Sequence, residues 1–198
     1  TRGRRLHSAG RESDADKFCG ATIFCDAASH FFHVEHQVTF TAHETIISKT
    51  SFERMAADMG VVADEYHTDN SVLKVKAFLH KLADKEQHIR FSGVCAQFQN
   101  GISENSIKIV VSRARTMMIH ASLHWPDAHE DAHWPLAVSH AAFLYNNTPN
   151  KESGIAPIEI FSQTQSDHQA LRNTHTWGCP AGGKIPMWSP LSRRGQYL

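Results

Sequence analysis

The chain has 198 residues, of which 41% are hydrophobic and 20% charged, a composition typical of a globular domain with a packed core. The formal net charge is zero, so there is no overall basic field that would by itself indicate a nucleic-acid partner. No apolar stretch reaches the roughly 18 residues of a membrane helix, and no signal peptide is visible, so we expect a nuclear or cytoplasmic protein that is not secreted. Because the sequence does not start with Met, we expect it to begin inside a longer reading frame.

The first part of the chain predicts a linker followed by two strands. Residues 1–18 are polar and irregular, which is typical of a linker. Residues 21–25 form a short apolar run, and residues 31–38 alternate between apolar and polar side chains as a strand does. The polar stretch 28–30 between them predicts a hairpin turn.

A helix is expected next, with a recognisable start and end. Thr41 has the character of an N-cap, and Glu44 follows at the spacing of a capping box. Apolar residues then recur at helical spacing until Gly60, which favours a stop. A short strand is expected over 61–67.

The rest of the chain predicts mainly helices. Apolar spacing indicates a helix over 72–82, a brief strand over 89–91 and, after a polar loop at 92–101, a long helix with an apolar face that continues to 121. Another helix is expected over 136–145. Strands first, then helices interleaved with short strands, favour a layered α/β domain.

Two carboxylates stand at positions that favour a site. Asp69 follows the strand predicted over 61–67, and Glu104 lies in the first turn of the long helix. In α/β domains, strand ends and helix starts often carry the functional groups. Carboxylate oxygens suit a hard cation such as Mg²⁺, and two such ions can clamp the reacting oxygens of a phosphoryl displacement. Spacing alone favours a plain ion pair between Glu104 and Lys108, four residues further on, over a metal site.

The charge is unevenly distributed along the chain. Between Asp69 and His120 the basic residues outnumber the acidic ones, although such a bias also occurs on ordinary solvated surfaces. On the long helix, Lys108 and Arg115 share a face with Glu104. A helix with an acid near its start and cations behind it can hold a metal ion at one end and nucleic-acid phosphates along its side.

Several motifs, in order, resemble segments of the copia-type retrotransposon integrase catalytic core. The resemblance extends over most of the chain, and each motif matches a different part of that core. The motifs are Phe24-Cys25-Asp26-Ala27-Ala28-Ser29, Thr68-Asp69-Asn70, Gln99-Asn100-Gly101-x-x-Glu104, Ser153-Gly154-Ile155-Ala156-Pro157-Ile158-Glu159-Ile160-Phe161 and Trp177-Gly178-Cys179.

This resemblance implies an RNase H-like three-layer α/β fold, in which a central mixed sheet has flanking helices. It implies a linker over 1–18, a core domain over 19–165 and an irregular tail over 166–198. It further implies a polynucleotidyl transferase that integrates DNA, with Asp69 and Glu104 holding Mg²⁺ or Mn²⁺ for 3′-processing and strand transfer. DNA is the implied partner, and a homo-oligomer is the implied assembly. The candidate phosphate contacts on the long helix are Lys108, Arg113 and Arg115.

The chain departs from the family pattern at informative places. The family uses three acids, and its first Asp lies on a strand that precedes the one ending near Asp26, so we expect that first strand to be missing and do not assign Asp26 as a catalytic residue. Asn105 stands where the copia type has Arg, and Ser71 where it has Gly. An alternative is therefore a non-catalytic remnant that keeps the fold and weak DNA binding.

A third hypothesis comes from the sequence His129-Glu130-Asp131-Ala132-His133, which matches the H-E-x-x-H zinc motif. A zinc metalloprotease would need both histidines on one face of a helix, with Glu130 polarising a zinc-bound water. Pro126 and Pro135 flank the motif and disfavour a continuous helix. With 15 histidines in the chain, a chance match is also expected.

Overall fold

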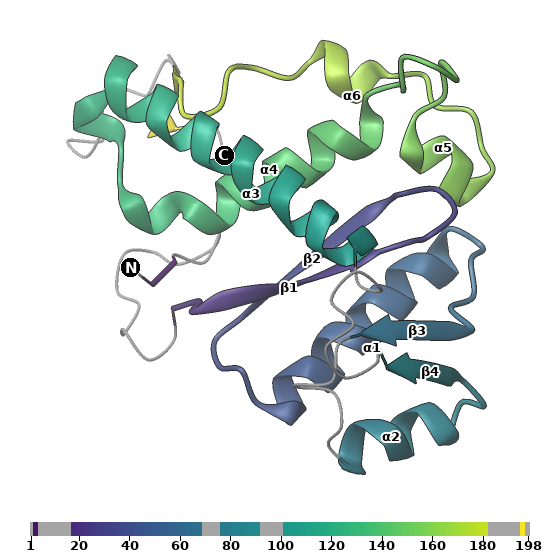
Figure 1. Cartoon of the computed structure of the whole chain (residues 1–198). Helices are drawn as coiled ribbons and strands as arrows, with labels where there is room; N and C mark the ends of the chain where they lie inside the picture. The colour runs from purple at the N-terminus through teal and green to yellow at the C-terminus, as the bar shows by residue number, and fades with distance from the viewer. Residues whose placement is uncertain (1, 4–16, 69–75, 92–100, 182–194, 197–198) are drawn as a thin grey trace, which may run out of the picture.

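The computed structural model describes residues 2–3, 17–68, 76–91, 101–181 and 195–196 (Figure 1). Within these ranges no helix has the length and apolar character needed to cross a membrane. The elements in chain order are β1 (Gly20–Cys25), β2 (Phe32–Gln37), α1 (Ala42–Asp58), β3 (Glu65–Thr68), α2 (Lys76–Ala83), β4 (His88–Phe91), α3 (Gly101–His124), η2 (Pro126–Ala128), η3 (Asp131–His133), α4 (Trp134–Asn147), α5 (Pro157–Ser162), α6 (Gln169–Arg172), β5 (Pro180–Ala181) and β6 (Gly195–Gln196).

The start and end of α1 confirm the sequence analysis. Thr41 has extended backbone angles, and its side chain accepts a hydrogen bond from the backbone N–H of Glu44 at 3.4 Å. This satisfies one of the amide groups that a helix start leaves without a partner. Gly60 follows the helix with φ of 76°, a left-handed conformation that favours glycine.

The strand predicted over 61–67 begins later than expected, at Glu65. Val61 donates its backbone N–H to the carbonyl of Ala56, so it still belongs to the end of α1. Val62 is 84% exposed and therefore lies outside the packed layers. Val61 and Val62 are therefore apolar residues at the end of α1 and on the surface, and they do not form part of the strand.

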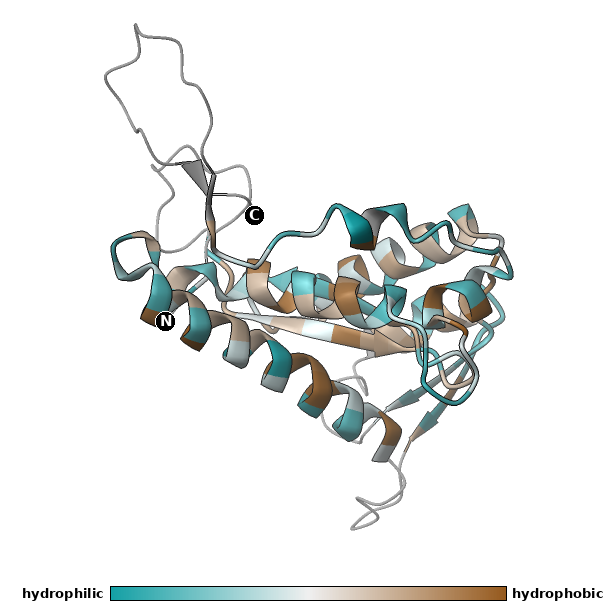
Figure 2. Cartoon of the chain, turned by 90° about the horizontal axis from the view of Figure 1, so that it is seen from above, coloured by the Kyte–Doolittle hydropathy of each residue, from teal (hydrophilic) through white to brown (hydrophobic). Residues whose placement is uncertain are grey.

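The hairpin of β1 and β2 lies between two layers of helices (Figures 1 and 2). On one face, Ile23 and Cys25 pack with buried Val110 of α3 and Ala141 of α4. On the other face, Phe24 packs with Phe52 of α1. Successive side chains of a strand point to opposite faces, so β1 contributes to both cores.

A row of aromatic contacts forms the core on the α1 side. Phe24 of β1 stacks on Phe52 of α1 with ring centroids 4.8 Å apart, and the ring of Tyr66 on β3 meets Phe24 edge-on at 6.5 Å. Phe31 stacks on Phe161 of α5 at 4.4 Å. Offset stacked and edge-to-face pairs are favourable aromatic geometries, so this row joins the hairpin, α1, α5 and β3.

The described strands form three two-stranded sheets, which differs from the single central mixed sheet that we expected. β1 and β2 pair antiparallel, while β3 and β4 pair parallel, from Glu65 opposite His88 to Thr68 opposite Phe91. Within the described ranges, β1 pairs only with β2, and β3 only with β4. The expected sheet is divided because no described strand links β1 to β3.

Asn146 of α4 closes the outer edge of β2. It is 6% exposed, and its amide side chain accepts a hydrogen bond from the N–H of Phe32 at 2.8 Å and donates one to the carbonyl of Phe32 at 2.7 Å. Both backbone groups therefore have a partner although no described strand lies beyond this edge. The clamp joins the hairpin to α4 across 114 residues of sequence.

We expect Asn146→Ala to lower the free energy of unfolding by about 2–4 kcal/mol, because each of two buried backbone groups loses its partner at a cost of about 1–3 kcal/mol. Urea denaturation followed by circular dichroism measures the change. Asn105→Ala, on the exposed surface of α3, serves as the control and should change stability by less than about 0.5 kcal/mol. Equal effects of the two substitutions would contradict the clamp.

Candidate metal and nucleic-acid site

The end of β3 and the start of α3 lie beside each other in both views (Figures 1 and 2). Thr68 is the last residue of β3, and Glu104 lies in the first turn of α3 with an exposed side chain. Asp69 comes directly after Thr68 in the sequence and lies outside the described residues. The structure thus brings together the two elements that precede Asp69 and carry Glu104, which are far apart in the sequence.

The start of α3 is held in place by buried side chains. Ser106 is 3% exposed and donates its hydroxyl to the carbonyl of Ile102 at 2.7 Å, and Val110 is fully buried against the hairpin and α4. Glu104 occupies the opposite, exposed side of the same turns. A rigid element therefore presents this carboxylate to solvent, as a metal or phosphate site requires.

The three candidate cations of α3 lie on two different faces. With 3.6 residues per turn, Lys108 and Arg115 fall on nearly the same side as Glu104, whereas Arg113 falls on the other side. The guanidinium of Arg113 lies 5.1 Å from the centre of the Tyr145 ring on α4. Arg113 therefore makes a cation–π contact within the domain, while Lys108 and Arg115 share the exposed face of Glu104.

An apolar groove of about 770 Å³ adjoins this face of α3. Arg115 lies at the groove, next to Ile107 and Val111, which are 49% and 48% exposed. Its other walls come from Ala21 and Ile23 of β1 and from the start of α4.

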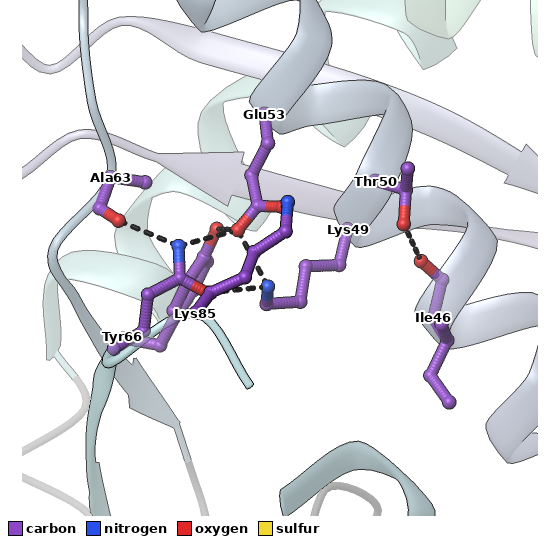
Figure 3. Close-up of polar contacts among 8 residues, drawn as sticks. Ile46, Lys49, Thr50, Glu53, Ala63, Tyr66 and Lys85 are labelled. Carbon is purple, nitrogen blue, oxygen red and sulfur yellow. Dashed lines mark hydrogen bonds and ion pairs between the residues drawn. The ribbon is translucent and has the colours of Figure 1, made fainter. Parts of the chain in front are cut away.

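A polar network fixes β3 against α1 (Figure 3). Glu53 of α1 binds the ammonium groups of Lys49 and Lys85 at 2.5 and 2.7 Å. Its Oε1 also accepts hydrogen bonds from the Tyr66 hydroxyl of β3 at 3.0 Å and from the Gln87 amide at 2.6 Å. Because Tyr66 lies two residues before the end of β3, this network helps to position the segment that leads to Asp69.

The network also sets the charge state of Glu53. Burial by itself raises the pKa of this carboxyl, but hydrogen bonds from Lys49, Lys85 and Gln87 outweigh burial and lower the pKa from 4.5 to about 2. Burial and the neighbouring Glu53 charge raise the pKa of Tyr66, so its hydroxyl stays a donor. Sequence analysis missed this network; the spacing of Lys49 and Glu53, four residues apart on a helix, was the only signal for it.

Asp26 has a structural role at the end of β1. Its Oδ2 accepts hydrogen bonds from the backbone N–H of Ser29 at 2.7 Å and from the Ser29 hydroxyl at 2.6 Å. The Ser29 hydroxyl in turn accepts the N–H of Phe31 at 3.1 Å. These bonds shape the turn between β1 and β2.

The backbone excludes the helical zinc site of the H-E-x-x-H motif. His129 and Glu130 have extended backbone angles, and only residues 131–133 form a short 3-10 turn before α4. His129 and His133 therefore do not lie one turn apart on a single helix, as the metalloprotease hypothesis needs. The flanking prolines correctly predicted this break.

Comparison with known proteins supports the fold. No protein-family model matches the sequence, and no curated protein sequence matches it. Among solved structures, the HTLV-2 integrase catalytic core domain in complex with magnesium (trimeric form) is similar, with a TM-score of 0.53 and 18% identity over 73% of this chain and 85% of that one. The BIV integrase catalytic core domain gives 0.50 and 14% over 71% and 84%.

A third similar structure is the simian T-cell lymphotropic virus intasome in complex with the PP2A regulatory subunit B56 gamma. Its TM-score is 0.55 with 17% identity, over 70% of this chain and 46% of that one. At these identities the likeness establishes the fold: the chain has the RNase H-like architecture of retroviral integrase cores, with small sheets. The copia-type assignment and the roles of Asp69 and Glu104 stay predictions.

The Glu53 network predicts a specific dependence of stability on pH. A folded-state pKa near 2 means that Glu53 stabilises the fold fully above its ordinary pKa of 4.5, and that this contribution is lost as the pH falls from about 5 to about 2. We expect Glu53→Gln to flatten the pH dependence in this window. At pH 7 it should cost about 3 kcal/mol, because the side chain of Lys49, 3% exposed, loses its counter-charge.

Urea midpoints measured at several pH values between 7 and 3 test this expectation. Glu152→Gln, an exposed carboxylate in the loop before α5, is the matched control and should follow the parent protein. A Glu53→Gln variant with the parent's pH profile would show that the network carries no stabilising charge interaction.

Proposed function

We propose that the chain is an integrase-type catalytic core that acts on DNA, with Asp69 and Glu104 as ligands of a divalent metal ion, Mg²⁺ or Mn²⁺. The observation that carries this proposal is the juxtaposition of the end of β3 with the start of α3 in a fold shared with integrase cores. The similar HTLV-2 core is in complex with magnesium, which supports the choice of metal. We further propose a nuclear or cytoplasmic location.

The residues present suit such an ion. Carboxylate oxygens are the ligands that Mg²⁺ prefers, and the exposed position of Glu104 leaves room for water and phosphate oxygens beside it. When bound, the metal supplies Lewis-acid activation for 3′-processing and strand transfer. The protein's own task is to hold Glu104 on α3, to present Asp69 after the end of β3 and to orient the DNA backbone.

A third carboxylate belongs to this proposal. The resemblance expects it on a strand that precedes β1 in sequence order. Phe24 of β1 and Tyr66 of β3 pack on the same side against α1, and each of these two strands has one pairing partner among the described residues. A strand between β1 and β3 would join the two pairs into one mixed sheet and bring its acid towards the end of β3.

Lys108 and Arg115 are the proposed phosphate contacts on α3. Both are exposed on the face of Glu104, so a DNA backbone held at the carboxylates passes along them. Arg113 was a third candidate, but its contact with Tyr145 directs it towards α4. The intasome among the similar structures supports DNA as partner, and the trimeric HTLV-2 core supports a homo-oligomer.

A non-catalytic remnant with the same fold and weak DNA binding is the second candidate. It is favoured by Asn105, which is exposed directly after Glu104 where the copia type has Arg. Loss of that cation removes a phosphate contact next to the site. The two candidates agree on metal and DNA binding and differ in strand cleavage.

We expect Asp69→Asn and Glu104→Gln each to weaken Mn²⁺ binding at least tenfold, because each removes a charged oxygen ligand. Isothermal titration calorimetry with MnCl₂ measures this, and Glu152→Gln should bind like the parent. Unchanged Mn²⁺ binding in both variants would overturn the metal site. Nicking of a labelled DNA end by the parent in Mn²⁺, lost in both variants, distinguishes the catalytic core from the remnant.

For DNA binding, we expect Lys108→Ala and Arg115→Ala each to lower the affinity for duplex DNA and to reduce the slope of log K against log salt by about 0.9. Fluorescence anisotropy at several salt concentrations gives both quantities. Arg113→Ala should change the slope less, since this side chain packs on Tyr145. If Arg113→Ala has the largest effect, the opposite face of α3 is the DNA surface.

A further inference from the structure

Two histidines form a pair at the far end of α3 from Glu104. His120 and His124 are four residues apart on the helix, so their side chains lie on the same face one turn apart. Their ring centroids are 4.0 Å apart with 17° between the ring planes. His120 is half-buried and His124 is exposed.

The tautomer of His124 is fixed by its backbone contact. Its Nδ1 lies 2.9 Å from the carbonyl oxygen of His120. A carbonyl only accepts hydrogen bonds, so Nδ1 carries the hydrogen and the lone pair of the neutral ring is on Nε2. Metal-binding histidines characteristically donate their other ring N–H to a carbonyl or carboxylate in this way, which orients the ring and makes the free nitrogen more basic.

Trp125 borders the pair on one side. Its ring lies 5.6 Å from that of His120 and 5.9 Å from that of His124, measured between centroids. The indole shields this side of the two imidazoles from water, while His124 keeps access to solvent. Among the residues that the structure describes, no group of three or more His, Cys, Asp or Glu side chains gathers around a common point.

We propose that His120 and His124 together bind a divalent transition-metal ion of the Cu²⁺, Ni²⁺ or Zn²⁺ class, with water completing the coordination. Imidazole nitrogen suits these ions, whereas Mg²⁺ prefers oxygen, so this site is chemically distinct from the carboxylates at the other end of α3. Nitrogen ligands bind such ions at about 2.0–2.1 Å. The two rings are stacked, so binding requires each ring to turn about its side-chain bonds until the two nitrogen lone pairs converge on the ion. The order of affinity is Cu²⁺ above Ni²⁺ and Zn²⁺.

The bound ion links His120 to His124 at the C-terminal end of α3. Both ligands belong to the same helix, so binding favours the helical conformation of the segment that leads to Trp125 and η2. Ala121, between the two histidines, is buried in the core next to Gly178. A metal at this pair therefore stabilises the helix end on which the segment around Trp177 packs.

The chain contains a matched control for this proposal. His129 and His133 have the same spacing in the sequence, but they do not lie on one helix. Their Nε2 atoms are next to the carboxylates of Asp131 and Glu130, at 3.3 and 3.8 Å. His129 and His133 are thus a second pair of histidines with the same spacing but a different backbone geometry. Comparing the two pairs distinguishes metal binding by a helical pair from the general affinity of a chain with 15 histidines for metal ions.

The test is titration of the full chain with NiCl₂ and CuCl₂ at pH 7.5 by calorimetry. We expect one tightest site that His120→Gln or His124→Gln weakens at least tenfold, and that His129→Gln leaves unchanged. Circular dichroism verifies that each variant keeps its helices.

The proposal is overturned if both His120→Gln and His124→Gln bind Ni²⁺ and Cu²⁺ as tightly as the parent, or if His129→Gln abolishes the tightest site. Glu104→Gln separates the two metal sites. It should leave Ni²⁺ and Cu²⁺ binding unchanged while it weakens Mn²⁺ binding, so failure of the carboxylate site and failure of the histidine site are independent results.

Discussion

The attachment of α1 to both strand pairs is the interaction on which the architecture depends. Phe52 stacks on Phe24 of the hairpin, and Glu53, the next residue, binds Tyr66 of β3. A two-stranded sheet is at best marginally stable alone, so each pair needs a layer to cover it. α1 supplies that layer with an apolar contact for one pair and a charged network for the other.

This attachment is also what gives the candidate site its geometry. β3 reaches the site from the α1 side, and α3 reaches it from the opposite layer, where it packs on the hairpin and α4. The end of β3 and the Glu104 side chain on α3 are thus each positioned by contacts made away from the candidate site. Lys49 is almost completely buried beside Glu53, and this charge pair helps to hold β3 in position. Replacing only one of the two residues would leave a buried charge without its partner and would destabilise the fold.

Short-range interactions along the sequence determined where several helices and turns of this protein begin and end. The cap at Thr41, the stop at Gly60 and the turn at 28–30 are short-range effects, and the structure has all three. Proline restricts the backbone of the residue before it, so the absence of a continuous helix through His129–His133 could also be predicted from the sequence. The order of the motifs indicated an integrase-core fold, and the solved structures agree. The role of Asp69 as a metal ligand stays a prediction from the sequence.

Only the tertiary structure decided which groups meet. Sequence periodicity shows that a strand exists but not which edges pair, so the two separate strand pairs, in place of one mixed sheet, were not foreseen. Arg113 and Arg115 look equivalent in the sequence, yet Arg113 makes a cation–π contact with Tyr145 of α4. The partners of Glu53 come from three segments that approach one another only when the layers pack. Contacts of this kind depend on the relative positions of distant elements, which local propensities do not encode.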